Sequence, residues 1–193
     1  MALFPSQNLE EQSFKSQNFS NQNFSDYAFI NCTFQHCHFN EAVLWNAKFS
    51  FCQFINCQLS LLKLEGCRLQ EVSFVECKIV GAEFFKCDKT FFSAAFKNCL
   101  LQYCNFSDLV MKSVSFSESK LKECYFTNTL LIAADFNKTD LSGTIFHNCD
   151  LSQADLSTAI NYHIDPLTNK IKKAKFSLPE AVGLLSSFDI TIV

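Results

Sequence analysis

Large apolar residues recur at every fifth position along most of the chain. The series begins at Phe14, shifts by two residues within 85–90, and resumes at Phe91. Neither a helix, with about 3.6 residues per turn, nor a strand, with alternating sides, keeps a strict period of five. The pattern therefore predicts a repeat architecture. Its members, which we call centres, are Phe14, Phe19, Phe24, Phe29, Phe34, Phe39, Leu44, Phe49, Phe54, Leu59, Leu64, Leu69, Phe74, Ile79, Phe84, Phe91, Phe96, Leu101, Phe106, Met111, Phe116, Leu121, Phe126, Leu131, Phe136, Leu141, Phe146, Leu151 and Leu156.

A second series lies two residues before each centre and consists mainly of small residues. Residues two apart on an extended segment point to the same side, so both series are expected to face inward. All eleven cysteines occupy this second position, which we call the small slot. The other three positions of each unit carry mostly polar side chains, and we expect them to face solvent. The predicted core includes Phe34, Phe54, Phe74, Phe96, Phe116, Phe136, Cys32, Cys52, Cys57, Cys77, Cys104 and Cys124.

Several units carry alanine, aspartate and an apolar centre in succession, as at 134–136 and 154–156. In these units the sequence resembles the pentapeptide-repeat family, whose unit reads alanine, aspartate or asparagine, leucine and two variable residues. The resemblance covers residues 14–159. It implies an all-β solenoid, a right-handed quadrilateral β-helix with four units per coil. By this count four aromatic residues fall on outer positions, namely Trp45, Phe51, Phe85 and Phe92.

The period divides the chain into three parts. Residues 1–13 are expected to form an N-terminal cap, residues 14–159 the β-helix, and residues 160–193 a C-terminal cap and dimerisation segment. Within the last part, 161–175 contains Pro166 and predicts an irregular or partly extended segment. Serine, proline and glutamate at Ser177–Glu180 then predict a helix start with Ser177 as its cap. The residues 190–193 predict a terminal strand.

The cysteines and histidines superficially suggest a metal site at Cys32, His36, Cys37 and His38. Structural zinc needs four converging ligands, but the repeat points the two cysteines inward and the two histidines outward. We therefore expect no metal site here. Cysteines twenty residues apart are expected to stack on adjacent coils as buried, inert thiols rather than as disulfides.

Composition narrows the function classes. The net charge of −3 argues against direct nucleic-acid binding, which usually needs a basic surplus. The chain has no stretch of 18 consecutive apolar residues, so we expect no membrane span. The N-terminal residues show no signal-peptide pattern. The odd number of cysteines, together with the lack of a signal-peptide pattern, favours a location of the protein in a reducing cytoplasm. No phosphate loop, nucleophile elbow or supported carboxylate pair is present, so we expect neither an enzyme nor a cofactor.

From Asp135 to Asp165 the chain has five acidic residues and a single basic residue, Lys138. We call this segment the acidic stretch. Four of its five aspartates directly precede a centre, so they are expected to project from the coils. This stretch is either a solubilising surface or an acidic surface that imitates DNA phosphate. The lysines at 170–175 either pair with acidic groups or are solvated. The five candidate partner-binding residues are Asp135, Asp140, Asp150, Asp155 and Asp165.

The C-terminal residues 161–165, 176–181, 184–185 and 189–190 resemble the tail of the albicidin-resistance group of pentapeptide-repeat proteins, relatives of the quinolone-resistance (Qnr) group. The resemblance implies a homodimer joined through the C-terminal helices. It also implies binding to bacterial DNA gyrase, and in some members topoisomerase IV, where DNA would lie, with protection from a drug or toxin, inhibition, or both. The alternative is a non-enzymatic scaffold with an unrelated partner. The expected dimer interface consists of Leu178, Ala181, Val182, Leu184, Leu185, Phe188 and Ile190.

Overall fold

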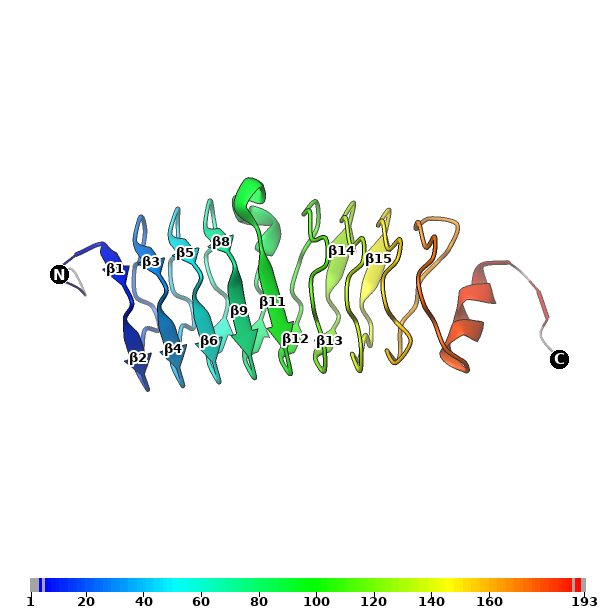
Figure 1. Ribbon diagram of the computed structural model, residues 1–193, viewed down its shortest axis with the longest axis horizontal. Helices are drawn as coiled ribbons and strands as arrows, with labels where there is room; N and C mark the ends of the chain where they lie inside the picture. The colour runs from blue at the N-terminus through cyan, green and yellow to red at the C-terminus, as the bar shows by residue number, and fades with distance from the viewer. Residues whose placement is uncertain (1–3, 5, 189, 192–193) are drawn as a thin grey trace.

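The computed structural model describes residues 4, 6–188 and 190–191. The chain winds into a rod of stacked coils, with its two ends at opposite ends of the rod (Figure 1). All strand pairs are parallel, and paired residues are mostly 20 apart in sequence, as in Phe14↔Phe34 and Phe34↔Phe54. Four units of five residues therefore make one coil, and the predicted β-solenoid is confirmed.

The coil has four sides, each formed by a stack of short strands or single bridges. Side 1 contains β1 (Asn8–Glu10), β3 (Ala28–Ile30), β5 (Lys48–Ser50) and β8 (Arg68–Gln70). Side 2 contains β2 (Ser13–Lys15), β4 (Thr33–Gln35), β6 (Gln53–Ile55), β9 (Val72–Val75) and β11 (Ala94–Lys97). Side 3 contains β7 (Gln58–Ser60), β10 (Lys78–Val80), β12 (Leu100–Gln102) and β13 (Lys120–Lys122). Side 4 contains β14 (Tyr125–Thr127) and β15 (Ile145–His147).

The chain turns each corner at the residue two positions after a centre. This residue repeatedly adopts a left-handed backbone, as at Asn46 with φ 53° and Asn148 with φ 55°. Asparagine tolerates this conformation better than most residues, which explains its frequency at the corners. Bulkier residues also occupy it, including Phe51 with φ 56° and Leu61 with φ 54°.

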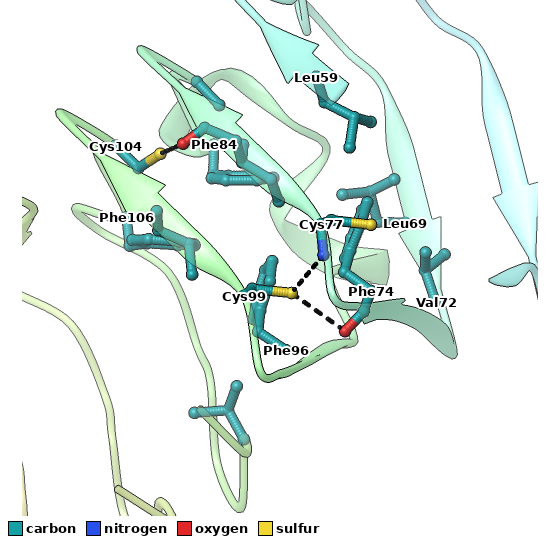
Figure 2. Close-up of a cluster of buried hydrophobic side chains, with 14 of the residues drawn as sticks. Leu59, Leu69, Val72, Phe74, Cys77, Phe84, Phe96, Cys99, Cys104 and Phe106 are labelled. Atoms are coloured by element: carbon teal, nitrogen blue, oxygen red, sulfur yellow. Dashed lines mark hydrogen bonds between the residues drawn. The ribbon is translucent and has the colours of Figure 1, made fainter. Parts of the chain in front are cut away.

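The centres and the small slot fill the interior. Every residue of the predicted core is buried, and all eleven cysteines are buried and free. Phenylalanines stack in columns along the axis, for example Phe84 on Phe106 at 4.7 Å between ring centroids and Phe74 on Phe96 at 5.1 Å. Figure 2 shows these rings and the neighbouring thiols converging inside the tube. Each coil therefore covers the apolar surface of the next.

At the phase shift, the expectation that Phe91 faces inward and Phe92 faces outward was wrong. Two short 3₁₀ segments, η1 (Phe84–Lys86) and η2 (Lys89–Phe91), interrupt the coil there. Phe92 turns into the core, whereas Phe91 is exposed and lies against the guanidinium of Arg68, 4.8 Å from its ring centroid. The two extra residues displace the register, because Phe96 pairs with Phe74 at a spacing of 22. Trp45 and Phe51 are exposed as expected, and Phe85 is half-buried.

The ladder extends beyond both expected limits of the β-helix. At the N-terminal end, Leu9 already pairs with Phe29, and Phe4 packs on Phe14 at 5.4 Å between ring centroids. At the C-terminal end, Lys170 pairs with Asp150 and Lys175 pairs with Asp155. The segment 161–175 is therefore a further coil rather than an irregular one, because Tyr162, Ile164 and Asn169 supply its inward side chains.

The tail follows this last coil as a 3₁₀ segment, η3 (Glu180–Phe188). The Ser177 hydroxyl donates to the Ser157 carbonyl and does not cap the tail, so that expectation was wrong. The amide of Ala181 donates instead to the Ser177 carbonyl at 3.0 Å. Of the expected terminal strand, residues 190–191 form no strand, and residues 192–193 lie outside the described part of the chain.

Candidate partner-binding surfaces

The small slot is more polar than its cysteines and alanines suggest. Five buried polar residues occupy it in the C-terminal half, and the sequence analysis did not assign them: Ser119, Thr129, Thr139, Thr144 and Asn169. Thr139 shows their role, since its hydroxyl donates to the carbonyl of Phe116 on the preceding coil at 2.9 Å. Their spacing from the centres was the signal that could have found them.

Most of the thiols make the same contact. Cys99 donates to the carbonyl of Phe74 at 3.4 Å, and its sulfur accepts the backbone amide of Cys77 at 3.4 Å (Figure 2). Burial raises the pKa of the Cys52 thiol to about 12, so this sulfur stays protonated at neutral pH. The small slot is therefore a hydrogen-bonded column, in which cysteine, serine, threonine and one asparagine perform the same task.

The five aspartates of the acidic stretch do not gather on one side of the rod. Asp135 and Asp155 are bridge partners on side 2. Asp140 follows Lys120 on side 3, and Asp150 follows Leu130 on side 1. Asp165 lies in the turn after His163 at the end of side 4. The structure thus distributes the carboxylates around the C-terminal half of the rod.

Each of these carboxylates is held by the turn that follows it. Oδ1 of Asp155 accepts the Ser157 amide at 3.1 Å and the Ser157 hydroxyl at 2.6 Å. Asp150 and Asp165 accept the amides of Ser152 and Leu167 in the same way, at 3.0 Å and 2.8 Å. Such short-range bonds fix the side chain and stabilise the turn. The aspartates therefore have a structural role as well as a charge.

The turns also lower the pKa of several of these carboxylates. Hydrogen bonds from Ser157 and the neighbouring Lys175 lower the pKa of Asp155 to about 2. Hydrogen bonds from Ser152 lower the pKa of Asp150. At Asp140, burial opposes the shift, but hydrogen bonds from Asn161 and Ser142 bring its pKa below the ordinary value. These three groups carry full negative charge at neutral pH.

Lysines of the last coil reduce the net charge of this surface. Lys175 Nζ lies 2.9 Å from Asp155 Oδ2. Lys170 is the bridge partner of Asp150 on side 1, and its charge contributes to the low pKa of that group. On side 2, Asp135 keeps only neutral partners, accepting the Ser115 hydroxyl at 3.0 Å and the Asn137 amide at 3.0 Å.

The tail divides the expected dimer interface into two groups. Leu184 packs against the end of the core, and Ala181 is half-buried. The remaining five apolar residues are exposed, with Leu178 at 78% of its full surface. These five, which we call the tail patch, are Leu178, Val182, Leu185, Phe188 and Ile190.

Two other kinds of site, a metal site and a membrane-spanning helix, are not found among the described residues. In the described part of the chain, no three or more histidine, cysteine, aspartate or glutamate side chains come together in a way that could hold a metal ion. Cys32 and Cys37 are buried while His36 and His38 are exposed, so these four side chains do not converge. No helix among the described residues has the length and hydropathy needed to cross a membrane.

Family models of pentapeptide repeats match most of this rod. A model of the pentapeptide repeat region matches residues 47–126, and a model of eight pentapeptide copies matches residues 29–61 and 124–160. The chain belongs to the pentapeptide-repeat family. This pentapeptide-repeat protein matches no curated protein significantly.

Solved structures of the same fold resemble it at low identity. A trypsin-treated variant of QnrB1, described as a plasmid-mediated fluoroquinolone resistance protein, is 21% identical with a TM-score of 0.46, over 96% of this chain and 91% of that one. Full-length QnrB1 is 19% identical with a TM-score of 0.39, over 95% and 100%. HetL, described as involved in heterocyst differentiation regulation in the cyanobacterium Nostoc, is 18% identical with a TM-score of 0.34, over 88% and 85%. These likenesses concern the fold alone.

Proposed function

We propose that this pentapeptide-repeat protein is a non-enzymatic DNA mimic that binds bacterial DNA gyrase, with topoisomerase IV as a second target. Binding would place the rod where DNA lies and would modulate the enzyme or protect it from a drug or toxin. The observation that carries the proposal is the set of fixed, ionised carboxylates around the C-terminal half of a rigid rod. The likeness of the tail sequence to the albicidin-resistance group supports the choice of gyrase.

The physical argument concerns pre-organisation. A surface that binds DNA presents cations at fixed positions, and a partner that competes there needs anions that are already ordered. Asp135, Asp140, Asp150 and Asp155 meet this need, because each accepts hydrogen bonds from the turn that follows it. Little side-chain entropy is then lost on binding.

The homodimer is part of the same proposal. Apolar residues of the tail patch are exposed together at one end of the rod, and a second copy would cover them. Two rods joined at this end would bring their aspartate-rich coils close to a two-fold axis. Such an arrangement suits a partner that is itself two-fold symmetric.

The test is a plasmid supercoiling assay with purified gyrase, with and without a fluoroquinolone. We expect the chain to change supercoiling or drug-stabilised cleavage. The variant with Asp135, Asp140, Asp150 and Asp155 all replaced by asparagine should lose the effect, because asparagine keeps the acceptor of each turn but not the charge. A matched control replaces Asp26, Glu41, Glu71 and Glu76 of the N-terminal half by amides, and it should behave as the original chain.

Absence of any effect up to roughly tens of micromolar, a range that covers most specific protein pairs, would reject the gyrase proposal. One observation favours the alternative, a scaffold for an unrelated protein partner. Lys175 and Lys170 lie beside Asp155 and Asp150, which makes the surface less acidic than DNA. If the asparagine variant and its control affect gyrase equally, charge mimicry is not the mechanism.

A further inference from the structure

The parallel ladder of side 1 is interrupted after β8. In a complete rung, such as Leu130, the amide donates to the Leu109 carbonyl of the preceding coil at 3.0 Å, and the carbonyl accepts the Met111 amide at 2.8 Å. By the same geometry the amide and carbonyl of Val110 point towards the coil before it. Neither group has a backbone hydrogen-bond partner among the described residues.

The phase shift explains the gap. The segment that should pair with Val110 is η2 and the residues around it, and its hydrogen-bonded amides donate either within the segment or to the coil before it. Asp88 donates to the Cys67 carbonyl at 2.9 Å, and Ser93 donates to the Leu69 carbonyl at 2.6 Å. β8 is accordingly the last strand of its sheet.

The interruption reaches into side 2. In the next coil the amide of Asp135 donates to the Val114 carbonyl at 2.8 Å, but the equivalent amide of Ser115 has no backbone partner in the described chain. The Ser115 carbonyl is paired, since it accepts the Phe96 amide at 2.8 Å. Unpaired backbone groups therefore lie on both sides of the corner at Ser113, at Val110 on side 1 and at Ser115 on side 2.

These unpaired groups border a groove with a volume of about 290 Å³. One wall is formed by residues 110–115 and the other by residues 71–73 and 93–95. Phe92 also lines it and is only 8% exposed, so its ring already fills the interior behind the groove. Val110 is 50% exposed and Ala95 is exposed, which leaves the walls accessible from solvent.

We propose that this groove binds an extended peptide segment of a partner protein by strand addition at Val110, on side 1. An extended backbone supplies an acceptor for the Val110 amide and a donor for its carbonyl at the required spacing. A helix does not fit this role, because its own backbone groups are paired and it is about 10–12 Å wide. The side chain facing Phe92 must be small, as glycine, alanine or serine, because the interior is full.

Charge favours a peptide over an anionic polymer. Glu71 on one wall and Lys112 on the other give the groove both signs. A nucleic acid would meet the Glu71 carboxylate and would offer few donors for the unpaired carbonyl. The groove contains none of the five aspartates of the acidic stretch, so this site is independent of the gyrase proposal.

The first measurement is hydrogen exchange of the free chain by NMR. The amides of Val110 and Ser115 should exchange at least about tenfold faster than those of Leu130 and Asp135, which occupy the same positions in complete rungs. Equal protection of the two pairs would mean that these amides are already paired, and the proposal would be wrong.

The second measurement is peptide binding by fluorescence anisotropy. The probe is an end-blocked, labelled heptapeptide. It has alanine at position 4, serine at positions 2 and 6, and threonine and lysine in alternation at positions 1, 3, 5 and 7. It should bind below about 1 mM and should slow exchange of the Val110 amide about tenfold. The same peptide N-methylated at every residue should bind about tenfold more weakly, since it lacks the donors.

A steric variant completes the test. Ala95→Trp fills the groove from its wall and should weaken the probe about tenfold. Gln53→Trp places the same side chain at the equivalent exposed position of a complete rung on side 2 and should leave binding unchanged. Binding that survives Ala95→Trp, or no binding by about 1 mM, would overturn the proposal, because a site that reads backbone should tolerate the sequence of the probe.

Discussion

Replacing Phe126 by alanine tests the inward assignment of the centres most directly. Phe126 has no exposed surface and lies between Phe106 at 5.0 Å and Phe146 at 5.1 Å, with both rings nearly parallel to its own. It also meets the edge of Phe116 at 5.8 Å. The substitution removes contacts with the coil before, the coil after and the adjacent side at once.

The expected cost has two parts. Transferring the ring to water costs about 1.5–3 kcal/mol, and the cavity left between two rigid coils adds to it. The total should be about 3–5 kcal/mol, because the rings above and below are held by their own strands and cannot close the space. The lost ring stacking lies within that range.

The assay is equilibrium unfolding in guanidinium chloride, followed by circular dichroism at fixed protein concentration. Phe51→Ala is the matched control, since Phe51 is 54% exposed at a corner, and it should change the free energy of unfolding by less than about 0.5 kcal/mol. A loss below about 1 kcal/mol for Phe126→Ala, with an unchanged denaturant slope, would contradict the packing described here. Equal losses for the two variants would contradict it as well.

Two further predictions concern buried hydroxyls and fixed carboxylates. Thr139→Val should cost about 1 kcal/mol in the same unfolding assay, because it removes the donor to the Phe116 carbonyl, whereas Thr139→Ser should cost less than the valine change. A valine variant as stable as the parent would show that the column of donors contributes nothing. The pKa of Asp155 is about 2 in the folded chain, below its ordinary value near 3.8, so its stabilisation is present above about pH 4 and is lost as pH falls towards 2. Allowing for the exposure of Lys175, we expect about 1–2 kcal/mol, and Asp155→Asn should flatten the pH dependence of unfolding in that range; an unchanged curve would refute this.

The sequence alone was sufficient for the regular part of the rod. A strict period of five, with a small residue two positions before each centre, was enough to predict the interior. The four-unit coil was implied by the resemblance to the pentapeptide-repeat family and not by the period itself. The positions of Cys99 and Phe96 inside the tube follow from counting. The polar residues of the small slot follow from the same count, although their hydrogen bonds to the preceding coil depend on its carbonyl positions.

The irregular parts were not predictable in the same way. At the phase shift, a count of five places Phe91 inward, but the 3₁₀ turn rotates the backbone by one residue and buries Phe92. At the last coil, a sequence without regular centres still winds once more, because Ile164 and Asn169 turn inward. The bridge Ile145↔His163 spans 18 residues there, whereas the bridge Asp150↔Lys170 spans 20. The spread of the five aspartates over several sides also follows from the coil, since residues five apart in sequence lie on successive sides.

Corner geometry has a consequence for how this chain can change length. Between Cys87 and Ala94 the coil takes up two additional residues, yet Phe96 and Leu101 return to the axial columns of Phe74 and Ile79. Insertions at a corner therefore stay local, because the coils beyond them dock by side-chain size and not by distance along the chain. A rod of this kind can accommodate a loop without rearrangement of its remaining coils.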